Sequence, residues 1–97
     1  MKLAERTLHK KLNEQHGRCF YCGELLSKGP IEIDHILPFS IHKNGRVSNL
    51  CLSCKDCNRL KGNKSLLDFK REVEKRCPIK LIRGMLYYEL LNLYPNG

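Results

Sequence analysis

The chain contains CFYC at residues 19–22 and CKDC at residues 54–57, and these two turns set the architecture of what lies between them. Each Cys-x-x-Cys turn directs two sulfur atoms at one point, so a pair of turns supplies the four thiolates of a tetrahedral zinc site. Cys51 also lies three residues before Cys54, and this spacing leaves a second pairing open. We expect structural zinc on one set of four cysteines: Cys19, Cys22, Cys54 and Cys57.

The two remaining cysteines are expected to take no part in the metal site. Cys51 follows Leu50 in an expected strand, where a free thiol packs as a small buried side chain. Cys77 has no cysteine partner nearby. Disulfides are the alternative use of six cysteines, but they require an oxidising compartment, and the charged N-terminal sequence MKLAERTLHKKL has no signal-peptide core.

Apolar residues recur at two different periods along the chain. Helical spacing predicts amphipathic helices, and alternation of apolar with polar side chains predicts strands. The sequence SLLD at residues 65–68 matches a capping box and marks a helix start. The expected elements, in order, are a helix at 3–15, a turn-rich segment at 18–30, a strand at 31–36, a loop at 38–48, a strand at 47–52, and helices from near Cys54, at 65–76 and at 79–94.

The chain is short and basic. The hydrophobic core of a 97-residue domain contributes little net stability, and a metal site would supply additional stability. The net charge of +8 favours a polyanionic partner, and residues 55–76 carry eight basic and four acidic residues, half of the excess. That segment is expected to face nucleic acid, although a solvated helix face would have the same composition. No stretch is apolar enough to cross a bilayer, so we expect a cytoplasmic, intracellular protein with no membrane partner.

Three further motifs accompany the cysteine turns. They are IDHILPFS at residues 33–40, SNL at 48–50 and NRLKGNK at 58–64. Together with the cysteines they resemble the HNH endonuclease family, in the version whose third motif residue is Asn and whose frame is braced by four-cysteine zinc. The resemblance covers about residues 19–69. It implies an α+β fold with a zinc-braced ββα-metal core, a short two-stranded antiparallel hairpin and flanking helices at 3–15 and 79–94, all within a single domain of residues 1–97.

The resemblance also implies a role for each motif residue. His35 would be the general base that activates water, while Asp34 and Asn58 would bind one catalytic divalent ion. An imidazole has an ordinary pKa of about 6.5 and accepts a proton near neutral pH. Carboxylate and amide oxygens suit Mg²⁺ or Mn²⁺ better than Ni²⁺. Asn49 would either brace the loop that positions the histidine or simply cap a turn.

Two classes of function remain open. The first is a metal-dependent DNA endonuclease of bacterial or phage type, which nicks or cuts both strands and leaves 5′-phosphate and 3′-hydroxyl ends. The second is a non-catalytic, zinc-stabilised module that binds nucleic acid. One ββα site cuts one strand, so double-strand cleavage would require a homodimer or a second event, and the chain could also belong to a larger protein. The residues expected to contact phosphates are Arg59, Lys61, Asn63 and Lys64.

Overall fold

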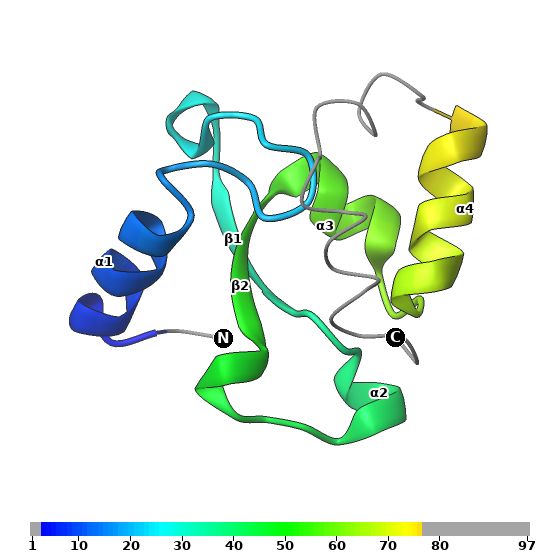
Figure 1. Ribbon diagram of the computed structural model, residues 1–97, viewed down its shortest axis with the longest axis horizontal. Coiled ribbons are helices and arrows are strands. Elements are labelled where there is room, and N and C mark those ends of the chain that lie inside the picture. Colours follow the sequence, from blue (N-terminus) through cyan, green and yellow to red (C-terminus); the bar gives the residue numbers. More distant parts are fainter. Residues whose placement is uncertain (1–2, 77–97) are drawn as a thin grey trace.

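The computed structural model of the chain describes residues 3–76. A two-stranded sheet lies in the middle, with α1 on one side and α3 and α4 on the other (Figure 1). The predicted α+β fold with a hairpin and flanking helices is confirmed, although the expected helix at 79–94 and Cys77 lie outside the described residues. The elements are α1 (Glu5–Glu14), η1 (Leu26–Lys28), β1 (Ile31–His35), α2 (Phe39–His42), η2 (Val47–Asn49), β2 (Leu50–Cys54), α3 (Lys55–Lys61) and α4 (Leu66–Arg76).

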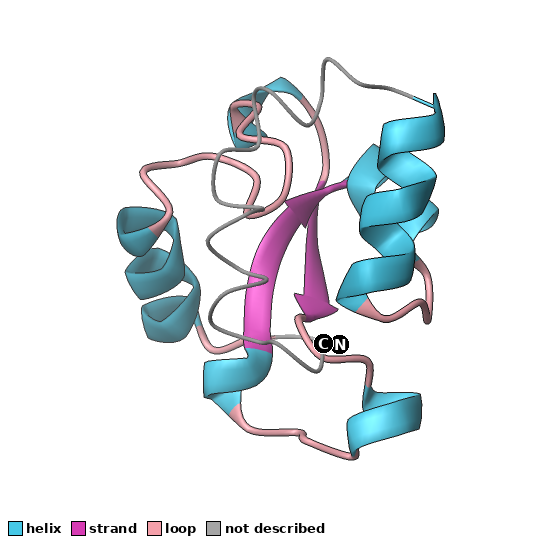
Figure 2. Cartoon of the chain, turned by 45° about the vertical axis from the view of Figure 1, so that its right-hand side comes forward, coloured by secondary structure: helices cyan, strands magenta, loops and turns pink. Residues whose placement is uncertain are grey.

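The sheet is an antiparallel pair in which β1 runs beside β2, as Figure 2 shows. Its register pairs Ile31 with Cys54 at one end and His35 with Leu50 at the other. Because side chains alternate across a strand, Glu32 and Asp34 share one face of β1. Residues of α3 contact both of these carboxylates, so this face is the one that α3 covers.

The second strand begins later than the sequence predicted. Residues 47–49 form the 3₁₀ turn η2, and the strand runs from Leu50 to Cys54, beyond the expected end at residue 52. The side chain of Asn49 accounts for the shift, because it accepts a hydrogen bond from Leu37 N and donates to the carbonyls of Leu37 and Asn44. These bonds hold the chain in a turn where β-propensity alone would extend it.

The expected loop at residues 38–48 also contains a short helix, α2 (Phe39–His42). Pro38 precedes it and accepts hydrogen bonds from the amides of Ile41 and His42. Lys43 ends the helix in the left-handed conformation, with φ of 55°. A single turn of helix fits among loop-forming residues because proline is well suited to a helix start, a signal that the prediction of a loop overlooked.

The side chains of Lys11 in α1 and of Gln15, which directly follows α1, bond to the outer edge of β2. Lys11 Nζ donates to Leu50 O at 2.6 Å, and Gln15 Nε2 donates to Leu52 O at 2.8 Å. The Leu52 amide in turn donates to Gln15 Oε1 at 2.9 Å. The Leu52 carbonyl also accepts a hydrogen bond from the Phe20 amide at 3.0 Å. The backbone groups of Leu52 therefore point away from β1 and are satisfied by Gln15 and by the first cysteine turn.

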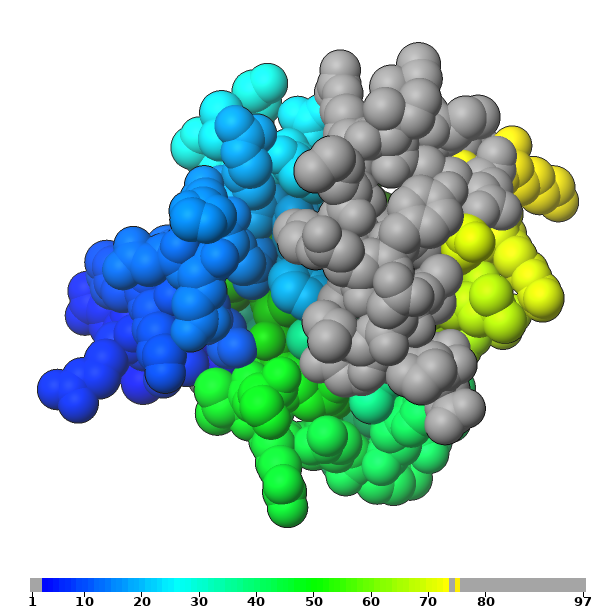
Figure 3. Space-filling model, in the orientation of Figure 1, coloured from blue at the N-terminus to red at the C-terminus, as the bar shows by residue number. Residues whose placement is uncertain are grey.

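The core is built where α4 and the cysteine turns meet the sheet. Leu66, Phe69 and Val73 lie three and four residues apart on α4 and are all buried. Tyr21 packs edge-on against Phe69, with ring centroids 5.2 Å apart. The predicted capping of this helix is confirmed, since the Asp68 amide donates to Ser65 Oγ at 3.1 Å. Figure 3 shows α1 in blue and α4 in yellow at opposite sides of the surface.

Candidate metal and catalytic site

Four cysteines gather at one end of the hairpin. The Sγ atoms of this group all lie within 4.8 Å of one another, and those of Cys22 and Cys54 are 3.8 Å apart. Tetrahedral zinc with Zn–S bonds of about 2.3 Å places its sulfur atoms about 3.8 Å from one another. The cluster could therefore hold zinc, and its members are the four cysteines predicted: Cys19, Cys22, Cys54 and Cys57.

The four thiols are crowded, and all except the half-buried Cys54 are buried. Hydrogen bonds from Cys22, Cys54 and Cys57 hold the pKa of Cys19 well below its ordinary value. Hydrogen bonding to the same Cys19 raises the pKa of Cys57. One thiolate is thus stabilised at the expense of the others, and four thiolates at such distances need a cation to offset their mutual repulsion. This donor set suits Zn²⁺.

Cys51 is not part of the cluster and lies three residues before Cys54 on β2. It is buried, and its Sγ donates to Tyr21 Oη at 3.4 Å. The expectation of a small buried thiol in a strand is confirmed. All five cysteines of the described residues are free thiols.

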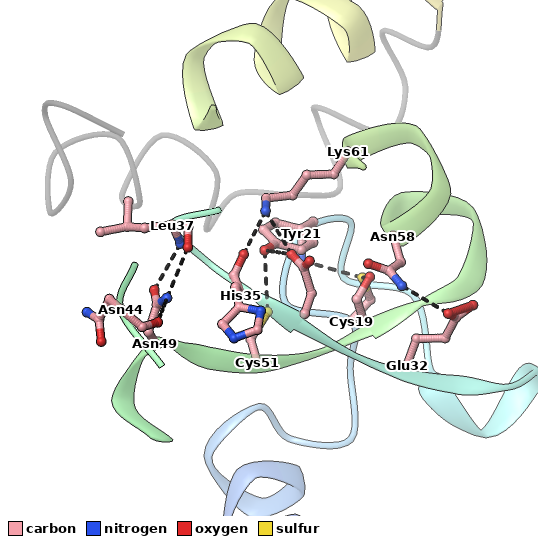
Figure 4. Close-up of polar contacts among 12 residues, drawn as sticks. Cys19, Tyr21, Glu32, His35, Leu37, Asn44, Asn49, Cys51, Asn58 and Lys61 are labelled. Atoms are coloured by element: carbon pink, nitrogen blue, oxygen red, sulfur yellow. Dashed lines mark hydrogen bonds and ion pairs between the residues drawn. The ribbon is translucent and has the colours of Figure 1, made fainter. Parts of the chain in front are cut away.

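Asp34 is buried and its Oδ2 atom receives two donors. The Tyr21 hydroxyl donates at 2.5 Å, and Lys61 Nζ lies 2.9 Å away (Figure 4). Burial against the Asp34 carboxylate and the Cys51 sulfur keeps the pKa of the Tyr21 hydroxyl well above its ordinary value, so that hydroxyl stays protonated and donates. The Asp34 carboxylate is thereby held by Lys61 of α3 and by Tyr21 of the first cysteine turn.

Asn58 lies over the same face of β1 but is partnered by a different carboxylate. Its Nδ2 donates to Glu32 Oε2 at 2.9 Å, two residues before Asp34 (Figure 4). The other oxygen of Glu32 is 3.6 Å from the Arg59 guanidinium. No hydrogen bond joins Asn58 to Asp34 within residues 3–76. The sequence prediction missed Glu32, although its place two residues before Asp34 on a strand put it on the same face.

His35 and Asn49 occupy the other end of the hairpin. His35 ends β1 and is half-buried, with its ring centroid 5.5 Å from that of Phe39. Asn49 is buried and makes three hydrogen bonds of 2.8 to 3.0 Å to Leu37 and Asn44. It therefore ties the segment directly after His35 to the start of β2.

The residues expected at phosphates divide into two groups. Arg59, Asn63 and Lys64 are exposed. Lys61 is fully buried, and its ammonium is occupied by Asp34. A direct phosphate contact requires an exposed ammonium, so the structure corrects the expectation for Lys61. Its burial follows from helical spacing, because residue 61 lies three residues after Asn58 and shares its sheet-facing side.

A hairpin followed by a helix, with a four-cysteine cluster at their junction, defines a small α+β domain that could bind zinc. Residues 19–66, from the first clustered cysteine to the start of α4, match the family described as HNH endonuclease. This match indicates a nuclease with nucleic acid as substrate. In the part of the chain from residue 3 to residue 76, no helix is long and apolar enough to span a bilayer.

Proposed function

We propose that this protein is a metal-dependent DNA endonuclease with His35 as general base and with Asp34 and Asn58 as ligands of one divalent cation. The observation that supports this most directly is the packing of α3 on β1. It brings the Asn58 side chain to the strand face that carries Asp34, one turn of helix from the lysine that contacts this carboxylate. The four-cysteine zinc keeps a structural role in this proposal.

The donor set fits a hard cation. Asp34 contributes an anionic oxygen, and the Oδ1 atom of Asn58 accepts no hydrogen bond from the described residues. Mg²⁺ and Mn²⁺ prefer such oxygens, whereas Ni²⁺ prefers imidazole. When bound, the cation supplies positive charge to the scissile phosphate and the leaving oxygen.

The protein groups perform the proton transfer and the positioning. The imidazole of His35 takes the proton of the attacking water, which is the contribution of a general base. Asn49 keeps that imidazole in place through its bonds to Leu37, two residues further along the chain. The exposed side chains of Arg59, Asn63 and Lys64 contact the phosphates on either side of the cleaved bond.

A zinc-stabilised binding module without catalysis is the second candidate, and the net charge of +8 favours it equally. Asp34 argues against it. A carboxylate that is about nine-tenths buried with two donors on one oxygen is costly to maintain, and binding a polyanion gives no reason to keep it. One site would nick one strand, and cutting both would require a homodimer or a larger parent protein.

The test is cleavage of supercoiled plasmid by the purified chain with Mg²⁺, Mn²⁺ or Ni²⁺. We expect nicking by the wild type and a loss of at least about 100-fold in His35→Ala, the usual contribution of a general base. His9→Ala is the matched control, because that imidazole is exposed on α1. Both variants should keep zinc. An intact plasmid with every metal, together with salt-sensitive DNA binding, would instead establish the binding module.

A further inference from the structure

Lys61 is the largest fully buried side chain of the described residues. Burying an ammonium is costly unless it is paired and hydrogen-bonded, so its partners explain why it is there. Nζ lies 2.9 Å from Asp34 Oδ2, donates to the carbonyl oxygen of His35 at 2.7 Å, and sits 5.7 Å from the centroid of the Tyr21 ring. A single ammonium thus contacts both adjacent residues of the proposed catalytic pair.

The two oxygens of Asp34 differ in what surrounds them. Oδ2 takes both the Tyr21 hydroxyl and the Lys61 ammonium. No described residue donates a hydrogen bond to Oδ1. Among the described residues, no buried side-chain oxygen or nitrogen lacks a partner, which means that Oδ1 retains contact with solvent. One oxygen is therefore held by the protein while the other stays open.

We propose that Lys61 is a positioning residue of the nuclease site. Together with Tyr21 it fixes the Asp34 carboxylate so that Oδ1 is the atom presented to the divalent cation. Through the His35 carbonyl it also fixes the strand end from which the imidazole projects. This inference rests on the proposed function and adds a role for Lys61 that replaces the expected contact with phosphate.

The placement of α3 explains why one lysine can serve both residues. Asn58 and Lys61 are three positions apart on that helix, so the side that offers the amide also directs the ammonium into the sheet. Displacing a reacting group by about 1 Å costs an enzyme on the order of 100-fold in rate. Loss of the ammonium should therefore lower turnover, because it frees both the carboxylate and the end of the strand.

Lys61→Met tests the proposal, because methionine retains much of the apolar stem and lacks the ammonium. We expect kcat for plasmid nicking to fall by about 10- to 100-fold. The KM for DNA should stay within about twofold, and the slope of log KM against log salt should not change. A lysine that contacts phosphate would instead raise KM and reduce that slope by about one.

The matched control is Lys11→Met. Lys11 is also buried, and its ammonium bonds only to the Leu50 carbonyl among the described residues. We expect this control to lower the melting temperature and to leave kcat within about twofold. A similar fall of kcat in Lys61→Met and Lys11→Met would show that Lys61 has a purely structural role.

Tyr21→Phe keeps the inference testable if Lys61→Met does not fold, as judged by zinc content and thermal unfolding. It removes one of the two donors to Oδ2 and keeps the ring, and kcat should fall by about 5- to 10-fold with KM unchanged. If both substitutions fold, the double variant should lose less than the product of the single losses, because both act on one oxygen. If the folded variants kept the kcat of the wild type, the positioning role would be refuted, while the proposed nuclease activity would still hold. An inactive wild type would instead refute the nuclease, and the inference with it.

Discussion

Replacing one cysteine at a time by serine distinguishes the two possible sets of zinc ligands. Cys57→Ser removes a sulfur that lies within 4.8 Å of three others, whereas Cys51→Ser alters a thiol bonded to Tyr21. Both cysteines are buried to nearly the same extent, with 2% and 1% of their surface exposed. Serine is similar in shape to cysteine, so both substitutions change the packing to a similar extent. A difference in zinc content between the two variants therefore reports on which cysteine binds the metal.

The expected magnitudes differ widely. Structural zinc in small domains contributes about 10–16 kcal/mol, while a domain of this size has a total stability of about 5–15 kcal/mol. A ligand lost from the cluster at Cys57 is therefore expected to leave the chain largely unfolded. Cys51→Ser loses one weak hydrogen bond and some apolar contact, at a cost of about 1–2 kcal/mol. That corresponds to a fall of roughly 5–10 °C in melting temperature.

Zinc content by mass spectrometry of metals and thermal unfolding by circular dichroism are the two measurements. We expect one zinc per chain in the wild type and in Cys51→Ser, and substoichiometric zinc with no cooperative transition in Cys57→Ser. Equal zinc retention in the two variants would refute the assignment of Cys57. Loss of zinc in Cys51→Ser but not in Cys57→Ser would show that Cys51 and Cys54 form the second ligand pair.

Two further predictions concern the loop and the surface. Asn49→Ala removes three hydrogen bonds of a buried side chain and should cost about 2–3 kcal/mol in urea unfolding, with reduced nicking. The control Asn63→Ala, at an exposed position, should stay within about 0.5 kcal/mol. A cost below that of the control would show that the brace is dispensable. Arg59→Gln and Lys64→Gln should each lower the salt slope of DNA binding by about one in fluorescence anisotropy, and an unchanged slope would place the DNA on another surface.

The features that could be predicted from sequence are the ones set by short-range spacing. Cys-x-x-Cys turns, the Ser65 cap of α4 and the alternation along β1 each depend on residues within a few positions of one another. The clustering of Cys57, and not Cys51, with the other three cysteines also agrees with the prediction, because a strand residue between two leucines is expected to be buried. These local signals were enough to define the hairpin, its helices and the four-cysteine cluster.

The features that could not be predicted depend on how one element sits on another. Lys61 lies in a basic segment, and its composition gave no sign that this one ammonium would turn inward to Asp34. The hydrogen bond between Asn58 and Glu32 likewise depends on the position along β1 at which α3 packs. Helical and strand periods identify which residues share a face, but not which pairs meet across the interface.

The contact of α1 with β2 bears on how the molecule behaves in concentrated solution. A two-stranded ribbon is marginal by itself, and its unpaired backbone groups are a template for strands of other chains. Gln15 satisfies both backbone groups of Leu52, and Lys11 satisfies the carbonyl of Leu50. Because these side chains and the Phe20 amide already bond there, the outer edge of β2 has fewer free backbone groups with which a strand of another chain could pair.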